Sequence, residues 1–264
     1  MPSPDIHLAA WNVNHRTGRK AIPPTLLHAI ATLDIDVLVL TEFVDGKHHD
    51  LFKESLKDIG YVGVAVSLKG AQQNQVLIAA RTELVADDLL PLPGYSDAAA
   101  TNWLHRRLPQ LDFEVVGLRS PTYVTLAGRE GYWNQVAHIV RLARERRVIF
   151  IGDLGTDPAT DTRGCAAPLQ RLFADGFALA RPEGDWSHRL PDGRTTRVDH
   201  AFTTPRLRIG GARYLYKAGR QRLVGAVNDA GDSLSDHALL SIRIARSTQC
   251  PCNEDHRTRG TQIA

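Results

Sequence analysis

Five short segments of the sequence carry side chains that bind metal ions or move protons. They contain paired amides, isolated carboxylates and two Asp-His pairs. In chain order they are Trp11-Asn12-Val13-Asn14, Leu40-Thr41-Glu42, Ile151-Gly152-Asp153, Arg197-Val198-Asp199-His200 and Ser235-Asp236-His237. Carboxylate and amide oxygens are ligands that hard divalent cations prefer, and a histidine held by an aspartate can meet negative charge as a donor. These residue types predict a site for a hard metal ion and a phosphate.

Each segment lies beside an apolar run with the length of a strand. The run from Val148 to Ile151 is continuous and is closed by Gly152 and Asp153, which is typical of a strand buried on both faces. A strand that ends in Gly-Asp can also be a simple turn with a side-chain hydrogen bond. Because the arrangement recurs at the ends of the runs 8–14 and 36–42, we expect the polar side chains to meet at one sheet edge.

The order of apolar patterns predicts one α/β domain. Helical periodicity is present at 25–33, 49–59, 130–146 and 169–174. Short runs at 61–66, 75–80, 84–89, 102–107 and 113–118 have no helical pattern between them, which favours an antiparallel meander. The last part again has the pattern of strands, at 186–188, 198–203, 207–209, 212–216 and 239–244. We expect a single domain over residues 1–247 and a disordered polar tail over 248–264.

Composition sets limits on location and partners. Among 264 residues, 43% are hydrophobic, no run reaches the ~20 apolar residues that cross a bilayer, and the N-terminus has no signal-peptide pattern. Three cysteines form no disulfide framework, so we expect a cytoplasmic protein. Cys250 and Cys252 with His256 have the wrong spacing for a zinc finger and are interpreted as unstructured thiols. The net charge of +3 is compatible with a polyanionic substrate but leaves the partner open.

The five segments, in this order, resemble those of the endonuclease/exonuclease/phosphatase superfamily, which includes DNase I and apurinic-site endonucleases of the exonuclease III type. The resemblance extends from Trp11 to Leu240. It implies a DNase I-like fold, a four-layer α/β/β/α sandwich of two mostly antiparallel sheets flanked by helices. It also implies a phosphoesterase that depends on a divalent metal, Mg²⁺ or Mn²⁺.

The resemblance assigns an expected role to each matching residue. Glu42 would be the principal metal carboxylate, Asn12 would help to hold the metal, and Asp236 would lie beside it. Asn14 would lie in the outer shell and contact substrate. The catalytic roles fall on the remaining matches: Asp153 would activate the attacking water, His237 would contact the phosphate, and Asp199 would fix His237.

Two positions depart from the family pattern. Gly155 stands where relatives carry an asparagine, and loss of one placed polar group can cost on the order of 10²–10³ in rate. Arg119 stands in the region where relatives carry a His or Tyr, and it could be either a phosphate clamp or a surface ion-pair residue. Trp186 is a candidate for base stacking. Asn74 is a weaker substrate-binding candidate that could equally be a turn residue, and His188 and His200 are interpreted as structural or surface residues.

Three functions remain open on the sequence. The first, which we favour, is a nuclease that takes DNA or RNA as its partner and acts as a monomer without an inferable protein partner. The second is a phosphatase or phosphodiesterase of a small-molecule or lipid phosphate ester. The third is a binding module with weakened catalysis, which the substitution at Gly155 favours and the retention of Glu42, Asp153, Asp199 and His237 opposes.

Overall fold

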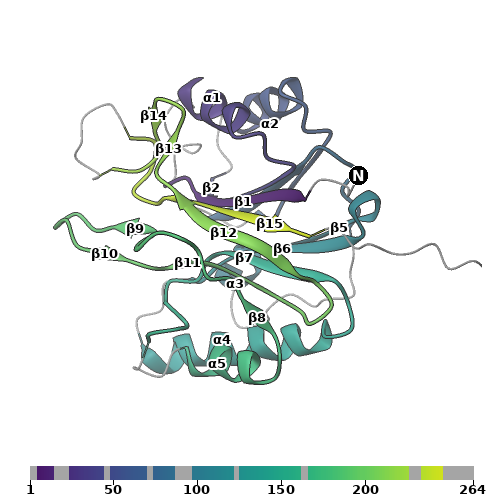
Figure 1. Cartoon of the computed structure of the whole chain (residues 1–264), viewed down its shortest axis with the longest axis vertical. Coiled ribbons are helices and arrows are strands. Elements are labelled where there is room, and N and C mark those ends of the chain that lie inside the picture. Colours follow the sequence, from purple (N-terminus) through teal and green to yellow (C-terminus); the bar gives the residue numbers. More distant parts are fainter. Residues whose placement is uncertain are drawn as a thin grey trace, which may run out of the picture.

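Two β-sheets pack face to face at the centre of the computed structural model. The structure describes residues 5–14, 24–44, 48–69, 74–86, 97–121, 125–161, 166–225 and 233–245. Figure 1 shows the two sheets between an upper and a lower layer of helices. The apolar runs of the sequence become the central strands, because a strand in the middle of such a sandwich is covered on both faces.

The first sheet has six strands and contains both ends of the described chain. Its order is β12 (Ile209–Leu215), β15 (Leu239–Ile244), β1 (Ile6–Asn12), β2 (Val37–Phe43), β4 (Gln75–Ala80) and β3 (Gly63–Val66). Strands β1 and β2 are parallel, and the other neighbours are antiparallel. Every residue of β1 and β2 is buried.

The second sheet has five strands. Its order is β5 (Trp103–Leu108), β6 (Phe113–Arg119), β7 (Val148–Asp153), β11 (Asp199–Thr203) and β8 (Ala178–Leu179). Only the pair β6 and β7 is parallel among these neighbours. Strand β7 is buried along its whole length, as its continuous apolar run predicted.

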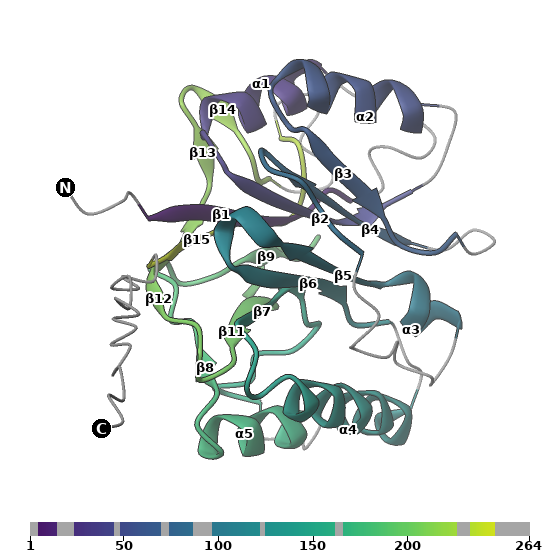
Figure 2. The same cartoon turned by 90° about the vertical axis from the view of Figure 1, so that its right-hand side faces the viewer.

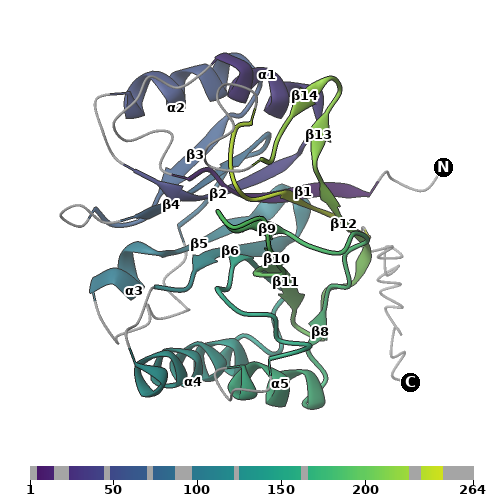
Figure 3. The same ribbon diagram turned by 90° about the vertical axis from the view of Figure 1, so that its left-hand side faces the viewer.

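Helices cover the outer face of each sheet. Figures 2 and 3 show α1 (Pro24–Thr32) and α2 (His49–Asp58) over the first sheet, and α4 (Leu126–Leu142) and α5 (Ala167–Ala174) over the second. The buried apolar residues accordingly form three clusters, one between the sheets and one under each helical layer. The predicted four-layer α/β/β/α sandwich is confirmed.

Smaller elements complete the described chain. The short helix α3 (Asp97–Thr101) precedes β5, and a 3₁₀ turn (Pro109–Leu111) joins β5 to β6. Two small hairpins pair β9 (His188–Arg189) with β10 (Thr195–Thr196) and β13 (Lys217–Ala218) with β14 (Gln221–Arg222). No helix among the described residues has the length and apolar character needed to cross a membrane.

The predicted meander is wrong, because its strands divide between the two sheets. Strands β3 and β4 belong to the first sheet and β5 and β6 to the second, with α3 between them. The expected strand at 84–89 is represented by one isolated bridge, from Val85 to Arg107, and residues 87–89 lie outside the described chain. Periodicity showed that the runs are strands, but it carries no information about which sheet a strand joins.

Several boundaries also differ from the prediction. The long helix begins at Leu126 rather than at 130, because the Thr125 side chain caps it by accepting a hydrogen bond from the Gly128 amide at 3.1 Å, and it ends at Leu142. The strand expected at 207–209 begins only at Ile209. The predicted tail lies outside the described residues, which end at 245.

Candidate active site

The strand register of the second sheet brings three predicted residues into one row. Arg119 ends β6 and is paired with Asp153 at the end of β7. Asp153 is in turn paired with Asp199 at the start of β11. An arginine and two aspartates, far apart in the sequence, therefore lie on neighbouring strands at the same edge of the sheet.

The first sheet contributes an amide and a carboxylate to the same edge. Asn12 ends β1, and its register partner on β2 is Thr41, the residue before Glu42. The Asn12 Nδ2 atom donates a hydrogen bond to Asp153 Oδ2 at 3.0 Å, in a buried contact that joins the two sheets. This bond shows that the strand ends of both sheets meet in one site.

His237 is fixed at its backbone by the first sheet. Trp11 Nε1 donates to the carbonyl oxygen of His237 at 2.9 Å, and the His237 amide donates to Ser235 Oγ at 3.0 Å. The Ser235 hydroxyl itself donates to the carbonyl oxygen of Asn12 at 2.7 Å. The segment before β15 is thus bound to the end of β1, which sets the position of the imidazole.

The His237 side chain forms a buried pair with Asp199. The Nδ1 atom lies 2.8 Å from Asp199 Oδ2, and the two side chains are 8% and 3% exposed. Burial alone would lower the pKa of His237, but the Asp199 carboxylate, with Asp153 and Asp236, outweighs it and raises the pKa to about 9. His237 is therefore an imidazolium at neutral pH, and its Nε2–H can donate to a phosphate oxygen.

Asp153 and Asp236 are shifted in opposite directions. Burial raises the pKa of the Asp153 carboxyl, and this effect exceeds the opposing charges of His237 and Arg119. Burial also acts to raise the pKa of Asp236, but the neighbouring imidazoles of His188 and His237 lower it overall. Asp153 is consequently the more basic of the two carboxylates, as a group that accepts a proton from water should be.

The Arg119 guanidinium contacts the Glu42 carboxylate and is mostly buried. Its Nε and Nη2 atoms are 2.9 and 2.7 Å from Glu42 Oε1, and its Nε is 3.8 Å from Asp153 Oδ2. The side chains of Arg119 and Glu42 are 16% and 11% exposed. The guanidinium is therefore in an ion pair that is mostly buried between two site carboxylates, and its role toward a phosphate stays a prediction.

Glu42 has an unusual backbone conformation. Its φ of +53° lies in the left-handed region, which a glutamate adopts only when the surrounding structure imposes it. The register between β2 and β4 shifts between Leu40 and Phe43, so Glu42 lies on an irregular part of the strand. Such irregularities next to a site redirect a side chain, and here the carboxylate meets Arg119.

Two glycines shape the end of β7. A Cβ atom on Gly152, where φ is +147°, would lie 2.0 Å from the carbonyl oxygen of Leu118, so only glycine fits. Gly155, with φ +63°, donates its amide to Asp153 Oδ1 at 2.9 Å. A Cβ atom there would meet Ser120 at ordinary contact distance, 3.5 Å. Gly155 thus lacks the asparagine side chain that the family resemblance led us to expect, but its backbone amide contacts Asp153.

The oxygen donors at this edge fit a hard divalent cation. Glu42 and Asp236 supply carboxylates, and Asn12 supplies a side-chain carbonyl oxygen that also accepts a hydrogen bond from the Asn14 amide at 2.9 Å. The buried Glu42 carboxylate meets a cationic group already, in Arg119. A metal ion bound to Glu42 would either share this carboxylate with the guanidinium or displace the guanidinium from it.

The substrate-binding predictions have mixed surroundings. Asn14, which has φ +50°, is half-buried and directly follows the Asn12 strand end. Trp186 is half-buried against the Tyr216 ring at 4.7 Å between centroids, and it packs on the core between the sheets. Asn74 is half-buried before β4, at the end of that strand where Gln75 pairs with Phe43. Their roles toward substrate stay predictions.

Sequence reasoning missed two residues of this region. His188 lies with its ring stacked on His237, at 4.3 Å between centroids and 20° between planes, although it was interpreted as structural or surface. Ser187 is fully buried, and its hydroxyl accepts hydrogen bonds from the amides of Val198 and Asp199, both at 3.0 Å. The turn Asp192-Gly193 was the available signal, because it predicts a hairpin that returns this stretch to Asp199. His200, by contrast, is buried, and burial lowers its pKa, as expected of a structural histidine.

Comparison with known proteins identifies the family. A sequence model described as the Endonuclease/Exonuclease/phosphatase family matches residues 9–237. No curated protein sequence matches the chain at a significant level.

Solved structures share the fold over most of the chain. The 3′ phosphatase NExo from Neisseria, solved with a product DNA hairpin, has a TM-score of 0.66 at 17% identity and covers 90% of this chain and 99% of its own. An AP endonuclease from Archaeoglobus fulgidus has a TM-score of 0.66 at 15% identity and covers 90% and 98%. Truncated TDP2 from Caenorhabditis elegans has a TM-score of 0.64 at 16% identity and covers 91% and 98%. At these identities the likeness shows the fold alone.

Proposed function

The chain belongs to the endonuclease/exonuclease/phosphatase family of phosphoesterase hydrolases, and we propose that it is a divalent-metal-dependent nuclease. One observation carries the proposal. The Asp199–His237 pair, the buried Asp153 and the Asn12 amide, drawn from both sheets, converge at one edge. A purely structural role for this edge would not require these groups to lie together.

The chemical step assigns one task to each buried group. Asp153, whose pKa is raised by burial, accepts the proton of the attacking water. His237, held as an imidazolium by Asp199, donates from Nε2 to a phosphate oxygen as negative charge develops there. Asp199 keeps the proton of Nδ1 in place and so fixes the orientation of the ring.

The proposed metal site draws on the ends of β1 and β2 and on the segment before β15. Glu42, Asn12 and Asp236 would hold Mg²⁺ or Mn²⁺, which supplies positive charge to the phosphate and lowers the pKa of water. Arg119 would then turn from Glu42 toward the phosphate, where a guanidinium binds two oxygens at once. This sequence of events makes Arg119 a counter-ion in one state and a phosphate clamp in the other.

Nucleic acid is the proposed substrate class. The chain carries a net charge of +3, and the Neisseria relative was solved with a DNA hairpin. The relatives described above are named as a 3′ phosphatase, an AP endonuclease and TDP2, so DNA ends and abasic sites are included among the test substrates. The distinction between DNA and RNA, and between ends and internal bonds, is left to the assay.

The test is cleavage of supercoiled plasmid, single-stranded DNA, RNA, an abasic duplex and a 3′-phosphorylated hairpin with Mg²⁺, Mn²⁺ or EDTA. We expect cleavage that needs the metal and that His237→Ala reduces by about 10²–10⁴. The matched control is His138→Ala, which removes an exposed histidine of α4 on the far side of the second sheet. Loss of activity in His138→Ala would mean that the assay reports general damage rather than the site.

The other two candidate functions are distinct outcomes of the same assay. Hydrolysis of bis-p-nitrophenyl phosphate or of a small monoester, without action on any nucleic acid, would replace the nuclease by a small-molecule phosphoesterase. Inactivity on every substrate, together with no detectable Mn²⁺ binding, would identify a binding module. Two observations favour this last outcome: the absence of a side chain at Gly155 and the ion pair between Arg119 and Glu42.

A further inference from the structure

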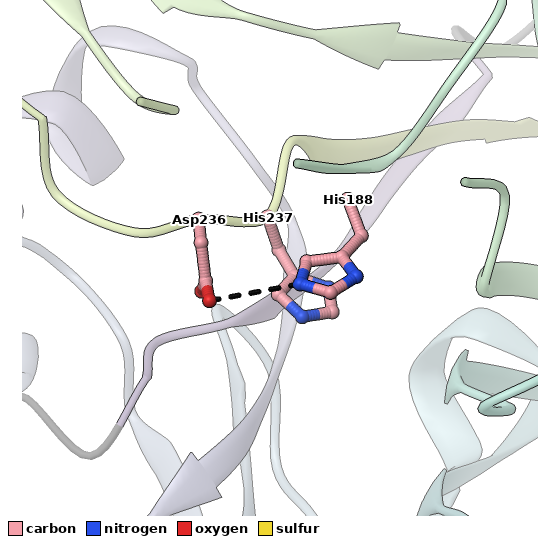
Figure 4. Close-up of side chains that lie close together, drawn as sticks. All are labelled: His188, Asp236 and His237. Atoms are coloured by element: carbon pink, nitrogen blue, oxygen red, sulfur yellow. Dashed lines mark ion pairs between the residues drawn. The ribbon is translucent and has the colours of Figure 1, made fainter. Parts of the chain in front are cut away.

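Three side chains on the rim of the site form a group with different ligand chemistry from that of Glu42. We propose that His188, Asp236 and His237 bind a transition-metal ion of the Zn²⁺ type, and that this ion inhibits the enzyme. Figure 4 shows the two imidazoles one over the other, with the Asp236 carboxylate directed at His188. One potential ligand atom from each residue lies within 4.8 Å of the other two.

The ligand types select the metal. Two imidazoles and one carboxylate are a common protein ligand set for zinc sites that keep a fourth position open. Mg²⁺ prefers oxygen ligands and retains its waters, so it would favour Glu42 and Asn12 instead. The described residues thus offer two cation sites of unlike chemistry, with Asp236 at the boundary between them.

The histidines already have the supporting contacts of metal ligands. A metal-bound imidazole usually donates its other ring N–H to a carboxylate, carbonyl or hydroxyl group. His237 Nδ1 is 2.8 Å from Asp199 Oδ2, which directs Nε2 to the rim. His188 Nδ1 is 3.4 Å from the Thr196 hydroxyl, and its Nε2 is 3.6 Å from Asp236 Oδ2. Both rings therefore present Nε2 as the ligand atom.

Backbone hydrogen bonds hold the three residues together before any metal binds. The hairpin that contains β9 docks on the segment before β15 through an antiparallel bridge between His188 and His237. The Arg189 amide donates to the carbonyl oxygen of Asp236 at 3.0 Å, and the Ala238 amide donates to that of Ser187 at 2.6 Å. The ligand-bearing backbones are thus preorganised, which limits the entropy lost on binding.

Only side-chain rotation is needed to close the site. In tetrahedral coordination with metal–nitrogen bonds of about 2.0–2.1 Å, ligand atoms are separated by about 3.3 Å. His188 and Asp236 are 19% and 17% exposed, so their side chains can turn to reach that separation and an ion can enter from solvent. His237, 8% exposed and bound to Asp199, is the fixed ligand around which they close.

Inhibition follows from the use of His237 Nε2 as a ligand, and this part of the inference rests on the proposed function. A zinc ion on Nε2 would occupy the atom that contacts the phosphate in the proposed function. It also withdraws Asp236 from the hard-metal site. Two kinds of ion would therefore have opposite effects on the enzyme. A hard cation would activate it at Glu42, and a transition-metal ion would inhibit it at His188.

Direct binding is measured with Co²⁺, a spectroscopic substitute for Zn²⁺, on the full chain carrying Cys250→Ser and Cys252→Ser. These changes leave one of the three cysteines, so that thiols of the tail do not bind the ion. We expect visible absorption bands that saturate near one equivalent and are displaced by Zn²⁺ but not by Mg²⁺. His188→Ala and His188→Gln should each weaken binding at least about 10-fold, the low end of what loss of a mere supporting contact costs. His138→Ala is the matched control and should bind as the parent does.

The activity arm compares Zn²⁺ inhibition at fixed Mg²⁺, each variant relative to its own uninhibited rate. We expect the inhibitory concentration to rise at least about 10-fold in His188→Ala and His188→Gln. Equal Co²⁺ affinity in the parent and both His188 variants overturns the metal site. Co²⁺ binding that depends on His188, in a protein without phosphoesterase activity, retains the metal site and overturns the proposed function. Co²⁺ binding that depends on His188 without Zn²⁺ inhibition overturns the inhibitory role.

Discussion

Asp199→Asn tests the electrostatic basis of the site most directly. Asparagine has nearly the shape of aspartate but no charge, so it can still occupy the position 2.8 Å from His237 Nδ1. The change removes the main group that keeps His237 protonated, and burial, which lowers the pKa of the imidazole, is left in place. We expect the pKa of His237 to fall by about 1–3 units.

The magnitude for stability follows from the shift of His237. Its pKa is about 9 in the folded protein, against an ordinary histidine pKa of 6.5. That difference, at 1.36 kcal/mol per unit, corresponds to about 3 kcal/mol. Because the folded pKa is raised, this stability is fully present below the unfolded pKa, about 6.5, and is lost as the pH rises through about 9.

The assay combines histidine NMR with denaturant unfolding. His237→Gln assigns the His237 signal among 11 histidines, and its titration gives the pKa in the parent and in Asp199→Asn. The free energy of unfolding of the parent should fall by about 2–3 kcal/mol between pH 6.5 and 9.5, and that of Asp199→Asn should fall much less over the same range. Measurements stop below pH 10, because burial raises the pKa of Tyr61 and Tyr214 and their ionisation would add to the signal above it.

Activity should follow the same ionisation. If the imidazolium is the phosphate donor, the rate falls as the pH rises through about 9 in the parent and at lower pH in Asp199→Asn. Asp50→Asn, which neutralises an exposed carboxylate of α2, is the matched control and should leave the His237 titration unchanged. A pKa of His237 at or below the ordinary histidine value, 6.5, in the parent would refute the reasoning, since the pairing with Asp199 would then fail to overcome burial.

Three further predictions concern the arginine and the two glycines. Arg119→Gln should bind Mn²⁺ about 5–10-fold more tightly by calorimetry, because it removes an ion pair on Glu42 worth about 1 kcal/mol, and weaker binding would contradict the competition. Gly155→Asn should raise turnover about 10-fold or more, because the backbone conformation tolerates asparagine, whereas a similar gain in Gly155→Ala would show that the amide is irrelevant. Gly152→Ala should cost more than about 3 kcal/mol of unfolding free energy, since its Cβ would lie 2.0 Å from the Leu118 carbonyl oxygen, and a variant of parental stability would refute that reading.

Much of the fold could be predicted because strands buried on both faces are recognisable in the sequence as continuous apolar runs. The run from Val148 to Ile151 has no polar residue to place at a surface, so it had to become a central strand, and Asp153 had to follow at its edge. The sequence could not say which strands share a sheet. The assignment of β4 and β5 to different sheets depends on contacts far apart in the chain, which local periodicity does not contain.

The candidate site shows the same division between local and distant information. Each polar strand end was visible in its own segment, and the family resemblance supplied the roles. The position of Arg119 on Glu42 was not visible, because it depends on the irregular backbone at residue 42 and on packing between β2 and β6. The stacking of His188 on His237 was hidden for a similar reason, since it results from the docking of a hairpin on a distant segment.

The charges at the sheet edge favour the binding of a cation there. Four carboxylates, those of Glu42, Asp153, Asp199 and Asp236, face the guanidinium of Arg119 and the imidazolium of His237. Counted over these six groups of the described residues, with all four carboxylates ionised, the sum is two negative charges, which equals in size the charge of one divalent ion. Burial instead raises the pKa of Asp153, as expected where the charged form lacks compensation. A bound divalent cation should therefore lower the pKa of Asp153 and make it available as a base, which couples metal binding to the activation of water within this one cluster.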